Sequence, residues 1–270
     1  MIRREAKLAD GRPGWLLIPQ QEHARLSYEL AAAWGNDDTP PLVCPPEEPG
    51  HPLAGVRAEL LEAIRRHDDG WAAWWDAPGF DAAGKPYAFT EMPTADAQRV
   101  WDGSIESCAP VGPLAGWVVA SHFAALQSKH DDDYPEWAGW LERVDGARAE
   151  WLEAWLAAGE GHTRELADRC LSLLQTFDWL SLWLCCYCPL ETHDQSIVEP
   201  LRIGGDHPGA PQTCFDSRGP GLVGVAPWPF RSRELSLHAD ARLTPADAPQ
   251  SHSGSPARAE RRSVGWTLRP

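Results

Sequence analysis

The sequence predicts an α+β fold in which a mainly helical body lies beside a small antiparallel sheet built from the N- and C-terminal segments. Apolar residues recur at intervals of three and four through the middle of the chain, which is typical of helices. Short strand-like runs occur at both ends. Because terminal strands that share a sheet need each other, we expect a single domain over residues 1–270. Its parts are an N-terminal hairpin (1–19), a helical body (20–188) and a loop-rich C-terminal part with strands (189–270).

The opening hairpin is predicted from two β-like runs, residues 2–5 and 15–18. Residues 10–14, with the sequence DGRPG, join them and have strong turn chemistry. Two linkers interrupt the helical body, at 35–52, which contains five prolines, and at 75–93. The helical periodicity predicts helices over residues 20–34, 53–66, 94–108, 113–127, 137–158 and 163–187.

The C-terminal part has a different composition. Residues 189–220 are rich in Pro, Gly, Asp and His and predict a loop. Residues 246–262 are polar and rich in small residues, so we expect them to be flexible and solvated. Strand-like runs complete this part at 222–226, 235–243 and 263–268.

Composition and charge restrict the classes of function. The 43% hydrophobic and 23% charged residues are typical of a globular protein. With 24 Lys and Arg against 39 Asp and Glu, the net charge of -15 repels phosphate backbones and anionic lipids. We therefore expect a small-molecule substrate, and neither a nucleic acid nor a membrane as partner. The sequence does not indicate an oligomeric state.

The N-terminal residues have no apolar segment typical of a secretory signal. The most apolar stretch, residues 171–190, contains Gln175 and Asp178 and is too polar for an unassisted membrane span. The seven cysteines, an odd number, do not resemble the disulfide framework of a secreted scaffold. These features predict a cytoplasmic protein with reduced thiols.

Five polar residues lie on the apolar faces of the predicted helices. His23 extends the apolar stripe of the first helix, and apolar residues frame His122 at offsets of three and four. His67 and Asp68 lie where the apolar face of the second helix ends. Asp178 is bracketed by apolar residues at offsets of four and seven. We therefore expect His23, His122 and Asp178 to point toward the core, and His67 and Asp68 to lie at the end of a core-facing side.

A buried aspartate needs a cation, hydrogen-bond donors or a shifted pKa. A metal ion could satisfy Asp178 if His23, His67, Asp68 and His122 also approach it. Imidazole nitrogens and carboxylate oxygens suit Mn, Fe, Zn or Ni. The sequence therefore predicts a site for a divalent metal ion. It leaves open a hydrogen-bonded polar network that fixes the packing of the helices.

The order His23, then His67-Asp68, then Asp178 resembles the HD superfamily of metal-dependent phosphohydrolases. In that superfamily an early helix gives a His, an adjacent His-Asp pair ends a second helix, and a late helix gives an Asp. The resemblance implies an HD-like helical bundle with a metal-dependent hydrolase activity.

Some HD members hold two irons and carry two further His between the pair and the final Asp. Resemblance to that branch implies iron-dependent oxygen chemistry as an alternative. Here His122 matches such a position on a helix, whereas His130 and His162 lie in polar segments. The sequence thus departs from the pattern of a dinuclear site.

Seven short segments carry a second resemblance, which covers nearly the whole chain. They begin at Gly14 (GWLLI), Gln21 (QEHARL), His67 (HDDGW), Phe89 (FTEMP), Ser121 (SHF), Phe177 (FDWLSL) and Pro227 (PWPF). They resemble the bacterial family called domain of unknown function 3891. That family implies no activity, so the functional expectations depend on the His and Asp residues.

Asp68 and Asp69 are the expected catalytic residues, because a carboxylate beside a metal ion can act as a base or orient the attacking water. Arg25 and Arg66 are the cations nearest to these residues in sequence, and we expect them to bind an anionic substrate.

Tryptophan is unusually frequent, with 15 residues, and Trp71 and Trp179 lie beside the proposed ligands in sequence. Core packing is the default role of such residues, and the alternative is that these two bind an aromatic or sugar-like substrate by stacking. The resulting hypothesis is a metal-dependent hydrolase of a small phosphorylated or otherwise anionic metabolite. The alternative is a non-catalytic helical protein with a structural or ligand-binding His/Asp network.

Overall fold

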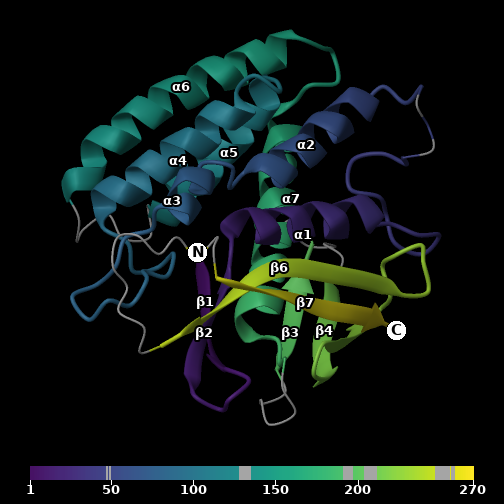
Figure 1. The fold of residues 1–270 in the computed structure, drawn as a ribbon. Helices are drawn as coiled ribbons and strands as arrows, with labels where there is room; N and C mark the ends of the chain where they lie inside the picture. Colours follow the sequence, from purple (N-terminus) through teal and green to yellow (C-terminus); the bar gives the residue numbers. More distant parts are fainter. Residues whose placement is uncertain are drawn as a thin grey trace.

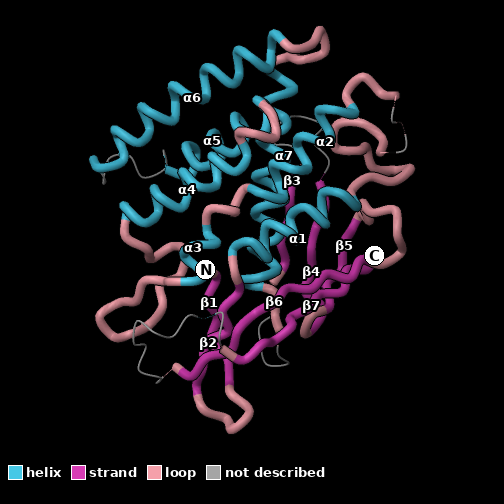
Figure 2. The backbone as a smooth tube through the Cα atoms, turned by 45° about the horizontal axis from the view of Figure 1, so that its top comes forward, coloured by secondary structure: helices cyan, strands magenta, loops and turns pink. Residues whose placement is uncertain are grey.

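The helices and strands form two layers in the computed structural model (Figures 1 and 2). The structure describes residues 1–270 except 47, 49, 128–134, 191–196, 204–211, 247–255 and 257–258. A curled sheet forms one layer, and the helices cover one of its faces. Helix α1 lies directly on the sheet, and α6 is the outermost helix in Figure 1.

Within the described residues, one sheet contains seven strands in the order β1-β2-β6-β7-β5-β4-β3. All neighbours are antiparallel except β5 and β7, which are parallel. The strands are β1 (Ile2–Lys7), β2 (Pro13–Ile18), β3 (Val198–Arg202), β4 (Gln212–Gly219), β5 (Leu222–Ala226), β6 (Leu235–Pro245) and β7 (Glu260–Arg269).

The prediction of a mainly helical bundle with a small antiparallel sheet is wrong. The sheet is mixed, and it is a full layer of the protein. Two of its strands, β3 and β4, lie in the segment 189–220. The composition of that segment, which is rich in Pro, Gly, Asp and His, predicts a loop instead. Strands β6 and β7 have 11 and 10 residues and are longer than the predicted strand-like runs 235–243 and 263–268.

Most of the segment 246–262, predicted to be flexible, lies outside the described residues. Glu260, Arg261 and Arg262, at its end, belong to β7 and pair with β6. The sequence of these three residues does not indicate a strand, because their charged side chains are exposed and an exposed strand end needs no apolar pattern.

The six predicted helices agree closely with the observed ones, because most of them bury one apolar face, and α5 is buried on nearly every side. The last predicted helix ends as a π-helix, η3 (Trp183–Tyr187), and a short helix, α3, was not predicted. The helices are α1 (Gln20–Ala33), α2 (Ala54–Arg66), α3 (Trp71–Asp76), α4 (Thr94–Cys108), α5 (Pro113–Gln127), η2 (Pro135–Trp137), α6 (Ala138–Ala157) and α7 (Arg164–Leu182). None of those in the described part of the chain is long and apolar enough to span a membrane.

Helices α3 and α4 cross with almost no space between their backbones. A Cβ atom added at Gly70 would lie 2.0 Å from the carbonyl oxygen of Val100 and 2.6 Å from the amide nitrogen of Ser104. Ser104 also accepts a hydrogen bond from the amide of Gly70 through its Oγ, at 3.1 Å. Gly70 therefore fixes the turn that follows His67 and Asp68.

The junction between β2 and α1 ties the start of the chain to β6. Strand β2 pairs with β6 only as far as Arg242, and α1 continues alongside the rest of β6. There Glu22 Oε2 accepts a hydrogen bond from the amide of Asp240 at 2.8 Å, and Arg25 donates one to the carbonyl of His238. Side chains of α1 thus take over the hydrogen bonds that a neighbouring strand would make.

Candidate metal centre

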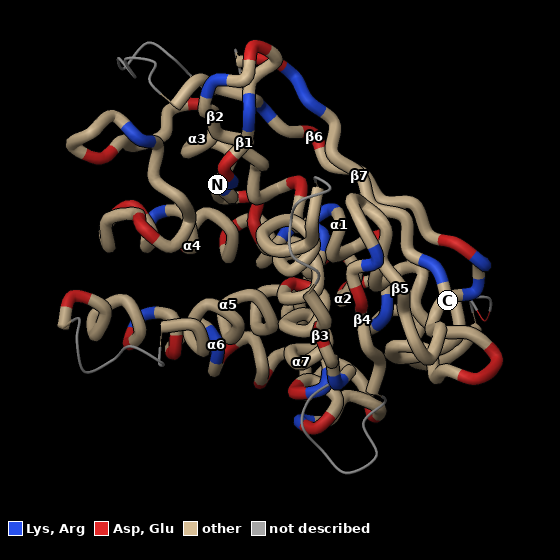
Figure 3. The backbone as a smooth tube through the Cα atoms, turned by 90° about the horizontal axis from the view of Figure 1, so that it is seen from below, with Lys and Arg blue, Asp and Glu red and all other residues tan. Residues whose placement is uncertain are grey.

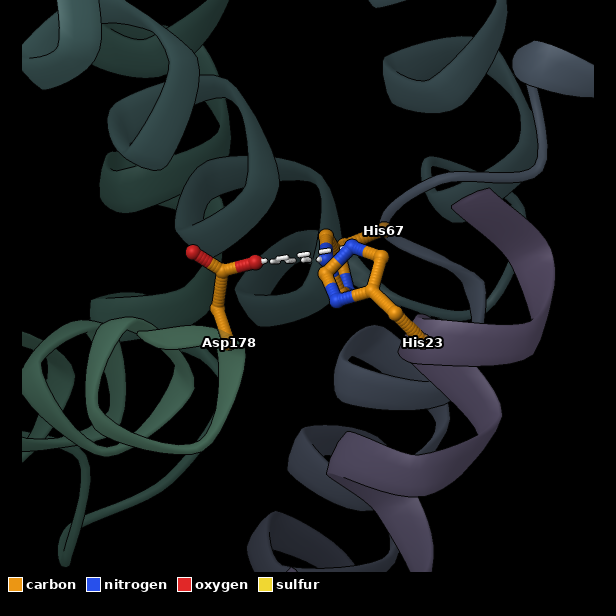
Figure 4. Close-up of side chains that lie close together, drawn as sticks. All are labelled: His23, His67 and Asp178. Carbon is orange, nitrogen blue, oxygen red and sulfur yellow. Dashed lines mark hydrogen bonds and ion pairs between the residues drawn. The ribbon is translucent and has the colours of Figure 1, made fainter. Parts of the chain in front are cut away.

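Three helices and the turn after α2 bring four of the predicted ligands together, and Figure 4 shows three of them, His23, His67 and Asp178. His23 projects from α1, and Asp178 projects from α7 toward it and toward His67. His67 caps the C-terminus of α2 with helical dihedral angles, and Asp68 follows it in the turn before α3. All four residues are buried. The α2–α3 turn therefore presents its His-Asp pair to the helices on either side.

The ligand atoms converge within a few ångströms. The Nε2 atom of His23 lies 2.6 Å from Oδ2 of Asp68 and 3.7 Å from Oδ1 of Asp178. The Nε2 atom of His67 lies 3.2 Å from Oδ1 of Asp178 and 3.7 Å from Oδ2 of Asp68. The ligand atoms of His23, His67 and Asp178 all lie within 4.8 Å of one another. We call His23, His67, Asp68 and Asp178 the His/Asp cluster.

Hydrogen bonds at Nδ1 fix the orientation of both imidazoles. In His67, Nδ1 lies 2.7 Å from the carbonyl oxygen of Ile64, which can only accept, so Nδ1 carries a hydrogen. In His23, Nδ1 lies 2.7 Å from Oγ of Ser181. Ser181 donates its own hydrogen to the carbonyl of Asp178 at 2.9 Å, so it accepts from His23. In both neutral rings the lone pair is therefore on Nε2, the atom that faces the carboxylates.

A lone pair that faces a carboxylate oxygen is repelled unless a proton or a metal cation lies between them. Burial alone would lower the pKa of His67, but the charges of Asp68 and Asp178 raise that pKa to about 9. Burial likewise disfavours the charged form of Asp178, yet the hydrogen bond from His67 and the nearby histidines hold its pKa well below the ordinary value. The cluster thus pairs two ionised carboxylates with the positive charge of His67.

His122 on α5 lies at the edge of the cluster. Its Nε2 atom is 3.8 Å from Oδ2 of Asp178, the carboxylate oxygen that turns away from the other histidines. Its Nδ1 atom is buried and has no hydrogen-bond partner among the described residues. Burial lowers the pKa of His122 to about 4, so the ring is neutral near neutral pH and one nitrogen is available to a ligand.

Comparison with known proteins identifies the family. Residues 1–246 match the family model described as "Protein of unknown function (DUF3891)". The chain belongs to this family. No curated protein and no solved structure matches the chain. The matched residues of this DUF3891 chain include the whole His/Asp cluster and His122.

The other predicted site residues of the DUF3891 chain lie outside the cluster. Asp69 Oδ2 accepts a hydrogen bond from Ser107 Oγ on α4 at 3.0 Å. Arg66 donates to the carbonyl of Ser107 at 3.0 Å. Arg25 pairs with Glu22 and Glu29 on its own helix and with β6. Within the described residues, neither arginine contacts the cluster, so both serve the packing of the fold.

The two predicted substrate-binding tryptophans have different environments. Trp71 is 4% exposed and packs with Met1, Leu17, Trp74 and Val100 in a small apolar cluster. Trp179 is 40% exposed, and its indole nitrogen donates to Glu199 Oε1 on β3 at 2.8 Å. Trp71 is thus a core residue, whereas Trp179 has the exposed ring face that stacking requires.

The weaker histidine candidates do not join the centre in the described part of the DUF3891 chain. His162 stacks on Trp155, with ring centroids 4.3 Å apart, and its Nδ1 lies 2.7 Å from the carbonyl of Trp155. His130 lies outside the described residues.

Sequence reasoning missed Ser181, which orients His23. Its Oγ atom also lies 2.7 Å from Oγ of Ser27, which donates to the carbonyl of His23 at 3.0 Å. Both serines are fully buried. The signal that could have found them is their spacing: Ser27 follows His23 by four residues and Ser181 follows Asp178 by three, so each lies on the same helix face as a ligand.

Replacing Ser181 with alanine should weaken metal binding by the DUF3891 chain by about tenfold to 100-fold, as losses of a ligand's orienting partner do. The physical reason is that the ring of His23 loses the acceptor that keeps hydrogen on Nδ1. Titration calorimetry with Mn²⁺ measures the change. Ser172→Ala, on the same helix outside the cluster, is the control and should bind as the wild type does. Equal affinities for both variants would contradict the positioning role.

Proposed function

We propose that this protein is a metal-dependent hydrolase of HD-like type that acts on a small phosphorylated or otherwise anionic metabolite. The proposal is carried by one observation: the Nε2 atoms of His23 and His67 converge on carboxylate oxygens of Asp68 and Asp178, with both Nδ1 atoms already hydrogen-bonded.

The donor set fits a divalent ion in charge and in spacing. Two carboxylates carry a charge of about −2, so one divalent cation held between them balances that charge. Two ligand atoms that each lie about 2.1 Å from an ion are roughly 3.0–3.5 Å apart in octahedral or tetrahedral geometry. The separation of 3.2 Å between His67 and Asp178 lies in that range, and the 3.7 Å between His23 and Asp178 lies close to it. The 2.6 Å between His23 and Asp68 is shorter than that range and is a hydrogen-bond distance. Mn, Fe, Zn and Ni all suit these nitrogen and oxygen ligands.

A divalent cation in this position supplies a Lewis acid and an activated water. Asp68 Oδ2, 2.6 Å from Nε2 of His23, occupies a position where it can accept a proton from a group bound beside that nitrogen. The side chain of Asp178 is 13% exposed, against 5% or less for the other three residues. The reacting group of a substrate would therefore approach from the side of Asp178. Because even the side chain of Asp178 is only 13% exposed, this approach favours a small reacting group.

The experiment compares metal-free protein with protein loaded with Mn, Fe(II), Zn or Ni on a panel of phosphomonoesters and nucleotides, with released inorganic phosphate as the readout. We expect release that depends on the metal and falls at least about 100-fold in Asp178→Asn. Asp76→Asn, an exposed aspartate outside the cluster, is the matched control. A protein that holds one equivalent of metal but hydrolyses none of the panel would contradict the proposal.

The second candidate is a non-catalytic role, which one specific observation favours. His23 and Asp68 form a hydrogen bond of 2.6 Å, and His67 and Asp178 form one of 3.2 Å, so the cluster can satisfy itself with protons alone. In that case Asp178→Asn lowers the unfolding temperature, and no metal binds to the wild type. Metal analysis and thermal unfolding together distinguish the two candidates.

A further inference from the structure

We propose a second binding site, on the sheet, for a small amphiphile with an apolar body and one anionic head group. A cavity of about 710 Å³ lies between the β1–β2 hairpin, β6 and β7. Its volume falls within the range of roughly 300–1,000 Å³ that is usual for small-molecule sites. None of the residues that line it belongs to the His/Asp cluster. The inference therefore does not depend on the proposed hydrolase function.

The register of the sheet places four of the lining side chains on one face. Arg4 pairs with Leu16 across β1 and β2, and Leu16 pairs with Leu243 across β2 and β6. Arg262 pairs with Ala241, two residues from Leu243, across β6 and β7. Directly paired residues point to the same side of a sheet, as do residues two apart on a strand. Arg4, Leu16, Leu243 and Arg262 therefore face the same cavity.

The apolar part of this face can hold a hydrocarbon body. Leu16 and Leu243 are buried, and Ala6, Leu190 and Val264 complete the apolar lining. Apolar surface in a concave site is the usual source of binding free energy for such a body.

Of the four charged residues that line the cavity, three are cations, Arg4, Lys7 and Arg262, and one, Glu5, is acidic. Glu260 pairs with Leu243 and so lies on the same face of the sheet, outside the lining. Arg4 is fixed in place because its Nη1 donates to the carbonyls of Cys188 at 2.8 Å and Cys185 at 3.3 Å, at the end of η3. Arg262 is exposed, and it forms no ion pair within the part of the chain that the structure describes. In a chain with a net charge of -15, this local reversal selects an anionic head group.

Figure 3 shows Lys and Arg positions around the β1–β2 hairpin and the adjoining end of β7, with Asp and Glu positions among them. Arg261 provides a natural comparison within the same strand. It pairs with Arg242, so it points to the opposite face from Arg262 and does not line the cavity.

The test is titration calorimetry of the full chain with decanoate, kept below its micelle concentration. We expect one saturable site and a dissociation constant that rises about tenfold in Arg262→Glu, the size of one charge-assisted hydrogen bond. Arg262→Gln should show a smaller loss in the same direction. Arg261→Glu, the matched control, and Asp178→Asn, which alters only the His/Asp cluster, should bind decanoate as the wild type does.

Several results would overturn the proposal. These are the absence of saturable binding, equal binding of decyltrimethylammonium, and equal losses in the Arg261 and Arg262 variants. Association with anionic lipid vesicles without binding of monomeric decanoate would also overturn it, because the site would then be a membrane-contacting surface. Loss of decanoate binding in Asp178→Asn would contradict the independence of the two sites.

Discussion

Replacing His67 with alanine should abolish stoichiometric metal binding, with a loss of affinity of more than about 100-fold, because a direct ligand matters more than an orienting partner. The wild type should bind about one equivalent of Mn, Fe(II), Zn or Ni after dialysis and metal analysis. His67 Nε2 lies between both carboxylates of the cluster, so its removal leaves two ionised groups with a single nitrogen ligand. If the wild type retains no stoichiometric amount of any of these metals, the metal centre is disproved.

Two controls separate ligand loss from unfolding in this experiment. Asp178→Asn keeps the volume of the side chain and should lose metal to a similar extent, because a neutral amide is a weaker ligand and a poorer partner for His67. His162→Ala removes a histidine that stacks on Trp155, outside the cluster, and should bind metal as the wild type does. Equal metal loss in all three variants would indicate general unfolding.

Gly70→Ala should destabilise the fold by about 3 kcal/mol, the upper end of the usual cost of overpacking. The new methyl group would lie 2.0 Å from the carbonyl oxygen of Val100, so the backbones of α3 and α4 must move apart. Because Gly70 lies two residues after Asp68 in the same turn, the same shift should weaken metal binding. Urea unfolding monitored by tryptophan fluorescence gives the free energy of unfolding.

Gly146→Ala is the matched control for that measurement. Gly146 lies within α6, and a Cβ atom added there meets nothing within 4 Å. Alanine is favoured over glycine inside a helix by about 1 kcal/mol, so this variant should be more stable than the wild type. A free energy of unfolding for Gly70→Ala within about 0.5 kcal/mol of the wild type would show that the α3–α4 crossing can relax at little cost.

The helices could be predicted closely because each buries a continuous apolar stripe, which the spacing of residues reveals. Strand β4 could not, since two of the side chains on its buried face are Thr213 and Ser217, with Phe215 between them. A buried face built from small polar residues leaves no alternation of apolar and polar residues to detect. Strand β3 has only five residues and contains Pro200, which argues against a strand in any single sequence.

The part of the site that could be predicted is the set of residues whose direction is determined by the buried face of a helix. His23, His67, Asp68 and Asp178 converge because each lies at a core-facing position of its own helix or at its end. Asp69 could not be placed by the same reasoning, since consecutive residues in a helical turn point in directions about 100° apart. The environment of Arg25 depends on a partner in β6, 213 residues away in sequence, which no local pattern encodes.

The hydrogen bonds between α1 and β6 have a consequence for dissecting the molecule. His23 lies on the helix turn that Glu22 and Arg25 fasten to the backbone of residues 238 and 240, so an N-terminal ligand is positioned by a C-terminal strand. A fragment that ends with α7 would contain every ligand and still lack the support that orients the first of them. The proposed metal centre is therefore not a portable helical module, and its residues could not be grafted onto another bundle without a substitute for β6.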